Sequence, residues 1–155
     1  MLLSLLVAAA VSAATQHFVP SKPTLGCYYE LPPTTEEVVT LNKSVRLWNT
    51  IIGRRAILIG TNRTGNVELL RVDAMGSDDE GETVGQWEML SSGLHLIQYT
   101  ATQHGLELDS IIVHELGHAL GLNHNSNPNS VMFAVPEAGS TPDSHDGAEA
   151  RSRWR

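Results

Sequence analysis

The stretch that most constrains this chain is His114-Glu-Leu-Gly-His-Ala-Leu-Gly-Leu-Asn-His124, which reads H-E-x-x-H-x-x-G-x-x-H. Two side chains four residues apart on an α-helix leave the same face, about 6 Å apart along the axis. This spacing of His114 and His118 suits two ligands of one Zn²⁺ ion. Glycine accepts the positive φ of a helix cap, so we predict that the helix ends at Gly121 and that the chain then returns His124 as a third ligand.

Three protein ligands leave a fourth position on zinc for water, which is typical of a catalytic site. Glu115 is adjacent to a ligand and is not needed as one, so its carboxylate can take a proton from that water, whose pKa zinc lowers to about 7. The sequence therefore predicts one catalytic Zn²⁺ held by His114, His118 and His124, with Glu115 as general base. The alternative is an amphipathic helix whose histidines pack against neighbours or face solvent.

These residues resemble the long zinc motif of the metzincin endopeptidases. Met132 lies eight residues after His124, within Asn129-Ser-Val-Met-Phe133, and resembles the Met-turn beneath the zinc of that family. The short His-to-Met spacing favours the matrixin branch, and so does Asn125, because astacins carry a glutamate there. The resemblance implies an α+β fold in which a twisted, mostly parallel sheet with one antiparallel edge strand is backed by the zinc helix and a second helix.

Apolar periodicity predicts the elements of such a fold independently. Val38, Leu41, Val45 and Trp48 recur at three-to-four spacing, which predicts an amphipathic helix from about 35 to 52. Strand candidates, recognised by short apolar runs between turn residues, are 27–31, 55–60, 66–72, 84–90 and 94–99.

Capping residues predict where the helices begin. Thr34 or Thr35 can cap the first helix, and Asp109 can cap the zinc helix. A third helix near the C-terminus is predicted to have Thr141 as its cap and Pro142 as its first residue.

The N-terminus predicts export. Residues 1–14 form an uncharged apolar run that ends in small residues, which resembles a secretory signal peptide cleaved after residue 13; the alternative is a buried N-terminal helix. We expect residues 14–26 to be an extended leader and 27–155 to be one catalytic domain. The protein is then secreted or extracellular, or periplasmic if it comes from a bacterium that retains it.

The net charge and the cysteine content limit the partners, disulfides and metal ions that we expect for this chain. The net charge is −7 and there is no basic stripe, so nucleic acid is not an expected partner, and we expect a monomer. The single cysteine, Cys27, is predicted to be buried in a strand; a latency ligand for zinc and an intermolecular disulfide are the alternatives. The acidic segment 73–85 lacks a recognised calcium-ligand spacing, so Ca²⁺ is conceivable but unsupported.

His95 stands where matrixins place a ligand of a second, structural zinc. The other ligands of that site come from the preceding segment, and residues 73–90 contain no histidine. We therefore expect His95 to be an ordinary strand histidine.

The sequence favours a secreted zinc endopeptidase acting on proteins or peptides. The resemblance implies that the segment after the Met-turn forms the wall of the first primed pocket, so Phe133, Val135 and Pro136 predict an apolar residue just after the scissile bond. Two alternatives are a non-catalytic zinc-binding recognition module and a hydrolase of another amide or ester bond.

Overall fold

The structure is a computed structural model that describes residues 24–60, 65–78, 81–100 and 108–154. The predicted signal peptide and most of the predicted leader lie outside the described residues. Within the described part of the chain, no helix has both the length and the apolar character needed to cross a membrane.

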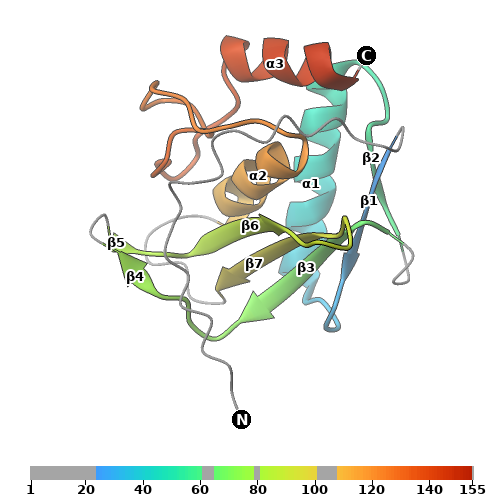
Figure 1. Ribbon diagram of the computed structural model, residues 1–155, viewed down its shortest axis with the longest axis vertical. Helices are drawn as coiled ribbons and strands as arrows, with labels where there is room; N and C mark the ends of the chain where they lie inside the picture. The colour runs from blue at the N-terminus through green and yellow to red at the C-terminus, as the bar shows by residue number, and fades with distance from the viewer. Residues whose placement is uncertain (1–23, 61–64, 79–80, 101–107, 155) are drawn as a thin grey trace.

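A five-stranded sheet forms one layer of the molecule (Figure 1). Its strands, in the spatial order β2-β1-β3-β7-β6, are β2 (Ile57–Ile59), β1 (Leu25–Tyr29), β3 (Val67–Val72), β7 (His95–Thr100) and β6 (Gly85–Met89). All neighbours pair in parallel except β6, which pairs antiparallel with β7 at the edge. This arrangement confirms the predicted fold class, and each strand end lies within two residues of its prediction. A short ribbon of β4 (Ser77–Asp78) and β5 (Gly81–Glu82) lies within the acidic segment 73–85.

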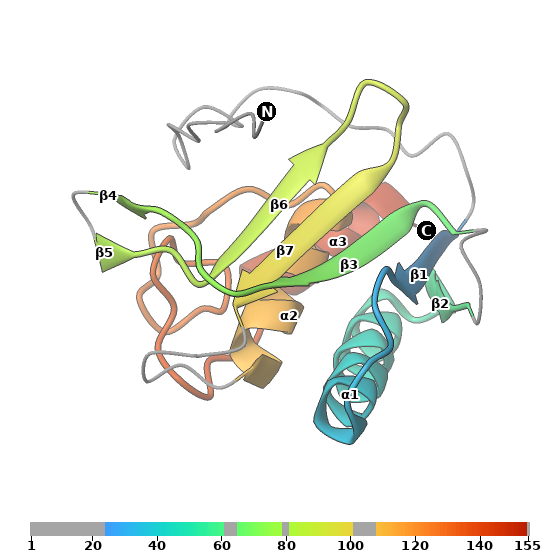
Figure 2. The ribbon, with the colours of Figure 1, turned by 90° about the horizontal axis from the view of Figure 1, so that it is seen from below.

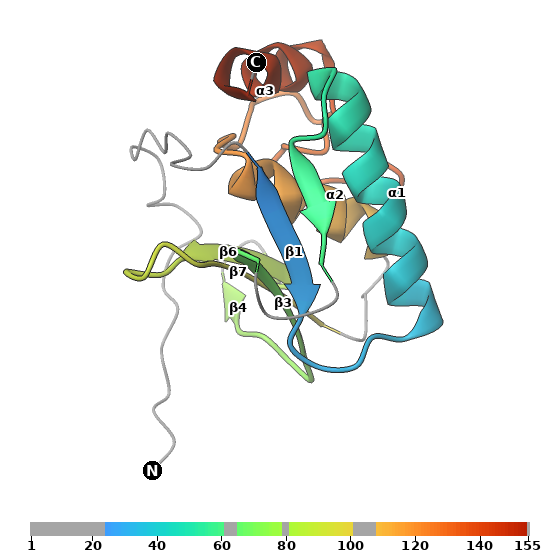
Figure 3. The same cartoon turned by 90° about the vertical axis from the view of Figure 1, so that its right-hand side faces the viewer.

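Three helices accompany the sheet in the described part of the chain. The helices α1 (Thr35–Ile52) and α2 (Leu108–Ala119) lie on the same face of the sheet (Figures 2 and 3). The third, α3 (Ser144–Trp154), packs against the C-terminal ends of α1 and α2, where Arg151 donates to the Ile51 carbonyl and Trp154 to the Leu120 carbonyl. The sheet and α1 thus enclose α2, which carries the histidine motif.

The start of α1 is fixed by a capping box. Thr34 Oγ1 accepts from the Glu37 amide, and the Glu37 carboxylate accepts from the Thr34 amide at 2.6 Å. Of the two candidate caps, Thr34 is the one used, and the predicted helix over 35–52 is confirmed.

Glu37 also ties α1 to the sheet. Its buried carboxylate accepts from Arg71 Nη1 at 2.7 Å and from the Tyr99 hydroxyl at 2.6 Å. Burial alone raises the pKa of this carboxyl, but the hydrogen bonds from Tyr99, Thr34 and Arg71 outweigh it, so the pKa lies below its usual value. The charge is therefore held in place between α1, β3 and β7.

The core lies between the helices and the sheet. Trp48 of α1 is fully buried and donates from Nε1 to the Val113 carbonyl at 2.9 Å. This hydrogen bond fixes the position of α2 relative to α1 along the helix axis. Cys27 is buried in β1 as predicted, and burial raises the pKa of its thiol to about 12, so it is an unreactive core residue.

The start of α2 differs from its prediction. Asp109 lies inside the first turn, which begins at Leu108, and is not the cap. Its carboxylate is engaged by α1, where it accepts from the Thr40 hydroxyl at 2.7 Å and from Lys43 Nζ at 3.1 Å. We expected the Asp109 carboxylate to accept from backbone amides at the start of the helix, but it instead makes a tertiary contact with α1.

The start of α3 also differs. The helix begins at Ser144, and Asp143 caps it by accepting from the amides of His145 and Asp146 at 2.8 and 2.9 Å. Thr141, the expected cap, instead forms an isolated bridge with Ser130. That pairing keeps the chain extended at Thr141, so the helix cannot start there.

Candidate metal centre

The helix α2 presents two histidines on one face. Its apolar residues Leu116 and Ala119 are fully buried, and His114 and His118 leave the opposite side of the helix. The ring centroids of the two histidines lie 4.7 Å apart. This is the arrangement expected from their four-residue spacing.

The helix α2 ends at Ala119, and the chain turns at Gly121, the glycine predicted to cap the helix. Gly121 has φ 91°, and its amide donates to the His118 carbonyl, while the Leu122 amide donates to the Gly117 carbonyl at 3.0 Å. A left-handed glycine here turns the chain back, as in other helix C-caps. The turn places His124 beside the two helix histidines.

The three imidazoles converge through their Nε2 atoms. The His118 Nε2 lies 3.0 Å from that of His114 and 3.1 Å from that of His124, and the third separation is 3.3 Å. A tetrahedral site with Zn–N bonds of 2.0–2.1 Å has nitrogen–nitrogen edges of about 3.3–3.4 Å. The group can therefore hold one metal ion.

Hydrogen bonds on the other ring nitrogens set the tautomers. His114 Nδ1 faces the Val131 carbonyl, and His118 Nδ1 faces the Leu122 carbonyl at 2.8 Å. A carbonyl only accepts, so Nδ1 carries the proton in both rings and Nε2 keeps its lone pair. Burial, the largest cause, lowers the pKa of His114 to about 4 and of His118 to about 3, so both are neutral at pH 7. Neutral donors of this kind fit zinc.

Glu115 lies on the same helix, between the two histidines in sequence. Its side chain is 4% exposed, and burial raises the pKa of the carboxyl to about 8. A Cβ built on Gly85 of β6 would lie 2.7 Å from Glu115 Oε1 and 2.6 Å from Ile111 Cγ2. Only a glycine at this point of β6 leaves room for the carboxyl as it stands.

The Met-turn lies directly beneath α2. Met132 is fully buried, and a Cβ on Gly117 would meet its sulfur at 2.4 Å. The Met132 carbonyl accepts from the Asn125 amide at 2.9 Å, directly after His124. Met132 therefore supports both the helix and the segment that returns the third histidine.

A buried polar cluster joins this turn to α3. Asp146 accepts from Asn125 Nδ2 at 2.7 Å and from the Ser130 hydroxyl at 2.5 Å. The buried Trp154 ring, which donates to the carbonyl of Leu120 at 2.8 Å, holds the end of α2. The C-terminal helix is thus part of the support for the histidine cluster.

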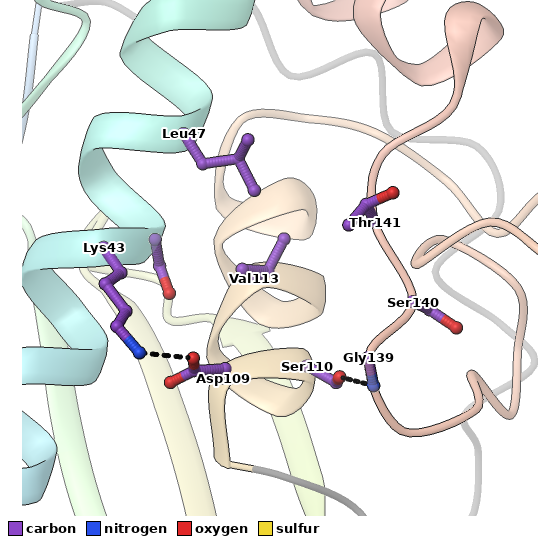
Figure 4. A pocket seen from close by; sticks show the side chains of 9 residues that line it. Lys43, Leu47, Asp109, Ser110, Val113, Gly139, Ser140 and Thr141 are labelled. Carbon is purple, nitrogen blue, oxygen red and sulfur yellow. Dashed lines mark hydrogen bonds and ion pairs between the residues drawn. The ribbon is translucent and has the colours of Figure 1, made fainter.

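The three predicted pocket residues follow Met132 in the chain and differ in exposure. Phe133 is half-buried, Pro136 is buried and Val135 is 52% exposed. A cavity of about 250 Å³ lies elsewhere, between α1, α2 and residues 139–141, and none of the three residues lines it (Figure 4). There the Ser110 hydroxyl accepts from the Gly139 amide at 2.9 Å, which anchors the segment that follows Met132 to α2.

Sequence reasoning missed two residues next to the cluster. Gly85 contacts Glu115, and Trp87, two residues later on β6, lies over the His118 ring with the centroids 6.0 Å apart. The period-two alternation of a strand puts both on the face toward α2. The glycine within this strand was the signal that could have identified the contact, since a strand glycine often marks a point where another segment closely approaches the backbone. His95, expected as an ordinary strand histidine, is buried in β7 and accepts from Trp87 Nε1 at 3.1 Å.

Comparisons with known proteins agree with this geometry. A family model described as matrixin matches residues 46–146, which include the three histidines and Met132. Human matrix metalloproteinase-15 is 41% identical over 58 residues, which are 37% of this chain and 7% of that protein. Mouse matrix metalloproteinase-25 is 59% identical over 29 residues, which are 19% of this chain and 5% of that protein. The chain thus matches less than a tenth of the length of either curated relative. With the family match covering well over half of its residues, the chain belongs to the matrixins, a family of metalloproteases.

Proposed function

We propose that this chain is a secreted zinc-dependent endopeptidase. The observation that carries the proposal is the convergence of three imidazoles, whose Nε2 atoms lie no more than 3.3 Å apart, beside the buried carboxyl of Glu115. His114, His118 and His124 would hold one Zn²⁺. When bound, the ion supplies Lewis-acid chemistry, which polarises a peptide carbonyl and makes water acidic enough to attack it near neutral pH.

Glu115 is the proposed general base. It accepts the proton of the attacking water and passes it to the leaving amine. Burial raises the pKa of the Glu115 carboxyl, which makes its carboxylate form a stronger base toward the proton of the attacking water. Gly85 keeps the carboxyl where it stands, and Met132 supports the helix from below.

We propose that the substrate binds as an extended strand along β6. This strand ends the sheet order and, among the described residues, pairs in that sheet with β7 alone, so its outer edge can pair with a peptide backbone. Phe133, Val135 and Pro136 form the wall of the first primed pocket and favour an apolar residue just after the scissile bond. A phenyl ring has no oxygen, so Phe133 adds no further metal ligand. A cleavage profile that prefers acidic residues at this subsite would contradict the assignment.

We further propose that residues 1–13 direct secretion and that the mature protein acts as a monomer on protein or peptide substrates. The apolar run at the N-terminus supports export. Mass spectrometry of the protein recovered from culture medium tests this, because a chain that begins after residue 13 is expected.

Glu115→Gln and His118→Ala test the two roles separately. Glu115→Gln keeps the shape and removes the base, so peptidase activity should fall by about 10²–10⁴ with zinc content unchanged. His118→Ala should lose both zinc and activity. Glu36→Gln, at an exposed position in the first turn of α1, is the matched control and should retain both.

Two outcomes would overturn these assignments. If Glu115→Gln loses zinc in parallel with activity, the carboxyl is structural. If the wild type binds zinc tightly but cleaves no peptide in a library, the chain is a zinc-binding recognition module and the proposed catalysis is wrong.

A further inference from the structure

The inner face of β6 touches the histidine cluster at one aromatic side chain. The rings of Trp87 and His118 have centroids 6.0 Å apart and planes inclined by 28°, which is an offset-stacked arrangement. His118 is half-buried, whereas His114, the other histidine on α2, is buried. Trp87 therefore lies beside the histidine ring on α2 that remains partly accessible to solvent.

The Trp87 ring is itself held in place. Its Nε1–H donates to His95 Nδ1 at 3.1 Å, and the two ring centroids lie 5.8 Å apart. His95 is fully buried in β7, and burial lowers its pKa to about 4, so the imidazole is neutral and keeps the lone pair that accepts this bond. An indole with one edge tied to the neighbouring strand cannot rotate freely away from His118.

The hydrogen bond that His118 makes within its own segment does not prevent its ring from tilting. The Leu122 carbonyl holds Nδ1 at 2.8 Å and sets the tautomer. A single hydrogen bond at one edge of a ring permits the ring to tilt, and a tilt moves Nε2 away from the Nε2 atoms of His114 and His124. The Trp87 indole lies against the face of the ring and opposes that tilt.

We propose that Trp87 is a positioning residue for His118, and that the buried hydrogen bond to His95 is what anchors Trp87 for this task. The inference rests on the proposed zinc site and concerns how the chain prepares it. Residues that orient a metal ligand from behind typically change metal affinity by about 10–100-fold when they are replaced. Trp87 acts through van der Waals contact with the ring face, and His95 acts through Trp87.

Metal affinity of the full chain tests the proposal without reference to catalysis. Zinc dissociation constants are measured by competition with a chromogenic chelator for wild type, Trp87→Leu and Trp87→Phe. Leucine fills space without an aromatic face, so Trp87→Leu should bind zinc about tenfold or more weakly. Phenylalanine restores the stacking ring, so Trp87→Phe should lie between the two. Glu88→Ala, at the exposed neighbouring position of β6, is the control and should match wild type.

The Co²⁺ visible spectrum provides a readout that general destabilisation does not move. If Trp87 orients His118, the ligand-field bands of Co²⁺-loaded Trp87→Leu should shift relative to wild type, and those of Glu88→Ala should not. A Trp87→Leu chain with wild-type zinc affinity and a wild-type Co²⁺ spectrum would overturn the proposal.

A second pair of variants decides the matter if Trp87→Leu does not fold. His95→Gln keeps an acceptor for the indole and should retain zinc affinity, whereas His95→Leu removes the acceptor and should weaken it several-fold. Equal affinities in this pair would refute the anchoring role. A wild type that binds no zinc would instead refute the proposed function, so the two failures are distinguishable.

Discussion

Replacing Gly85 with alanine tests how closely β6 is fitted to the candidate base. The added Cβ would lie 2.6 Å from Ile111 Cγ2 and 2.7 Å from Glu115 Oε1. Carbon atoms in contact are ordinarily about 3.5–4.0 Å apart, so one or both neighbours must move by roughly 1 Å. Gly85 is not among the glycines with positive φ, so the substitution tests space and not backbone strain.

We expect Gly85→Ala to lower both the free energy of unfolding and the catalytic rate. Adding a methyl group to a well-packed site costs about 1–3 kcal/mol of the free energy of unfolding. Displacement of a catalytic group by about 1 Å costs about 10² in rate. We therefore expect kcat of Gly85→Ala to fall by about 10². Zinc affinity should be nearly unchanged, because the nearest neighbours of the added Cβ are Ile111 and Glu115 and not a histidine.

The assay compares kcat on a fluorogenic peptide with zinc content and urea unfolding. Gly76→Ala is the matched control, because a Cβ at Gly76 meets nothing within 4 Å and its φ is not positive. A Gly85→Ala protein whose kcat lies within twofold of wild type would show that Glu115 adjusts freely, and the argument from close packing would fail.

Three further substitutions address stability, measured by urea unfolding. Gly117→Ala pushes a Cβ to 2.4 Å from Met132 Sδ and should cost about 1–3 kcal/mol; no loss would mean that the Met-turn yields readily. Trp154→Phe leaves the Leu120 carbonyl without its indole donor and should cost about 0.5–1.5 kcal/mol, and an unchanged midpoint would argue against this link. The pKa of His95 is lowered to about 4 in the folded chain, so the unfolded state takes up the proton first and stability falls as pH drops from about 6.5 toward 4, by about 3 kcal/mol at most. His95→Gln should flatten that part of the pH profile, and an identical profile would contradict the reasoning.

Local signals in the sequence predicted the site's own residues. The 114–124 spacing follows from helix geometry and from a glycine that can turn the chain, and the structure places His114, His118 and His124 together with Gly121 at φ 91°. The extent of α1 was also predictable, because apolar periodicity and a capping box act within the segment itself.

Residues that act across the fold could not be predicted in the same way. Asp109 has the chemistry of a cap, but α1 supplies competing donors from 66 and 69 residues away in sequence, and no local pattern reveals them. The roles of Gly85 and Trp87 likewise depend on which residues of α2 face β6. That register is set by the packing of α2 against α1 and the sheet, where Trp48 holds the Val113 carbonyl.

One strand has two tasks under the proposed function, and this has a kinetic consequence. The inner face of β6 carries Gly85 and Trp87 against Glu115 and His118, while its outer edge is the proposed place for the substrate backbone. A peptide that pairs along the whole edge restrains the strand that positions the base and a ligand. Binding energy from remote residues should then appear partly in kcat, because it is used to hold groups that act in the transition state. We expect kcat to rise as a peptide series is extended along the unprimed side, more steeply in wild type than in Trp87→Phe. A series in which only KM changes, equally in both proteins, would show that the edge and the inner face of β6 act independently.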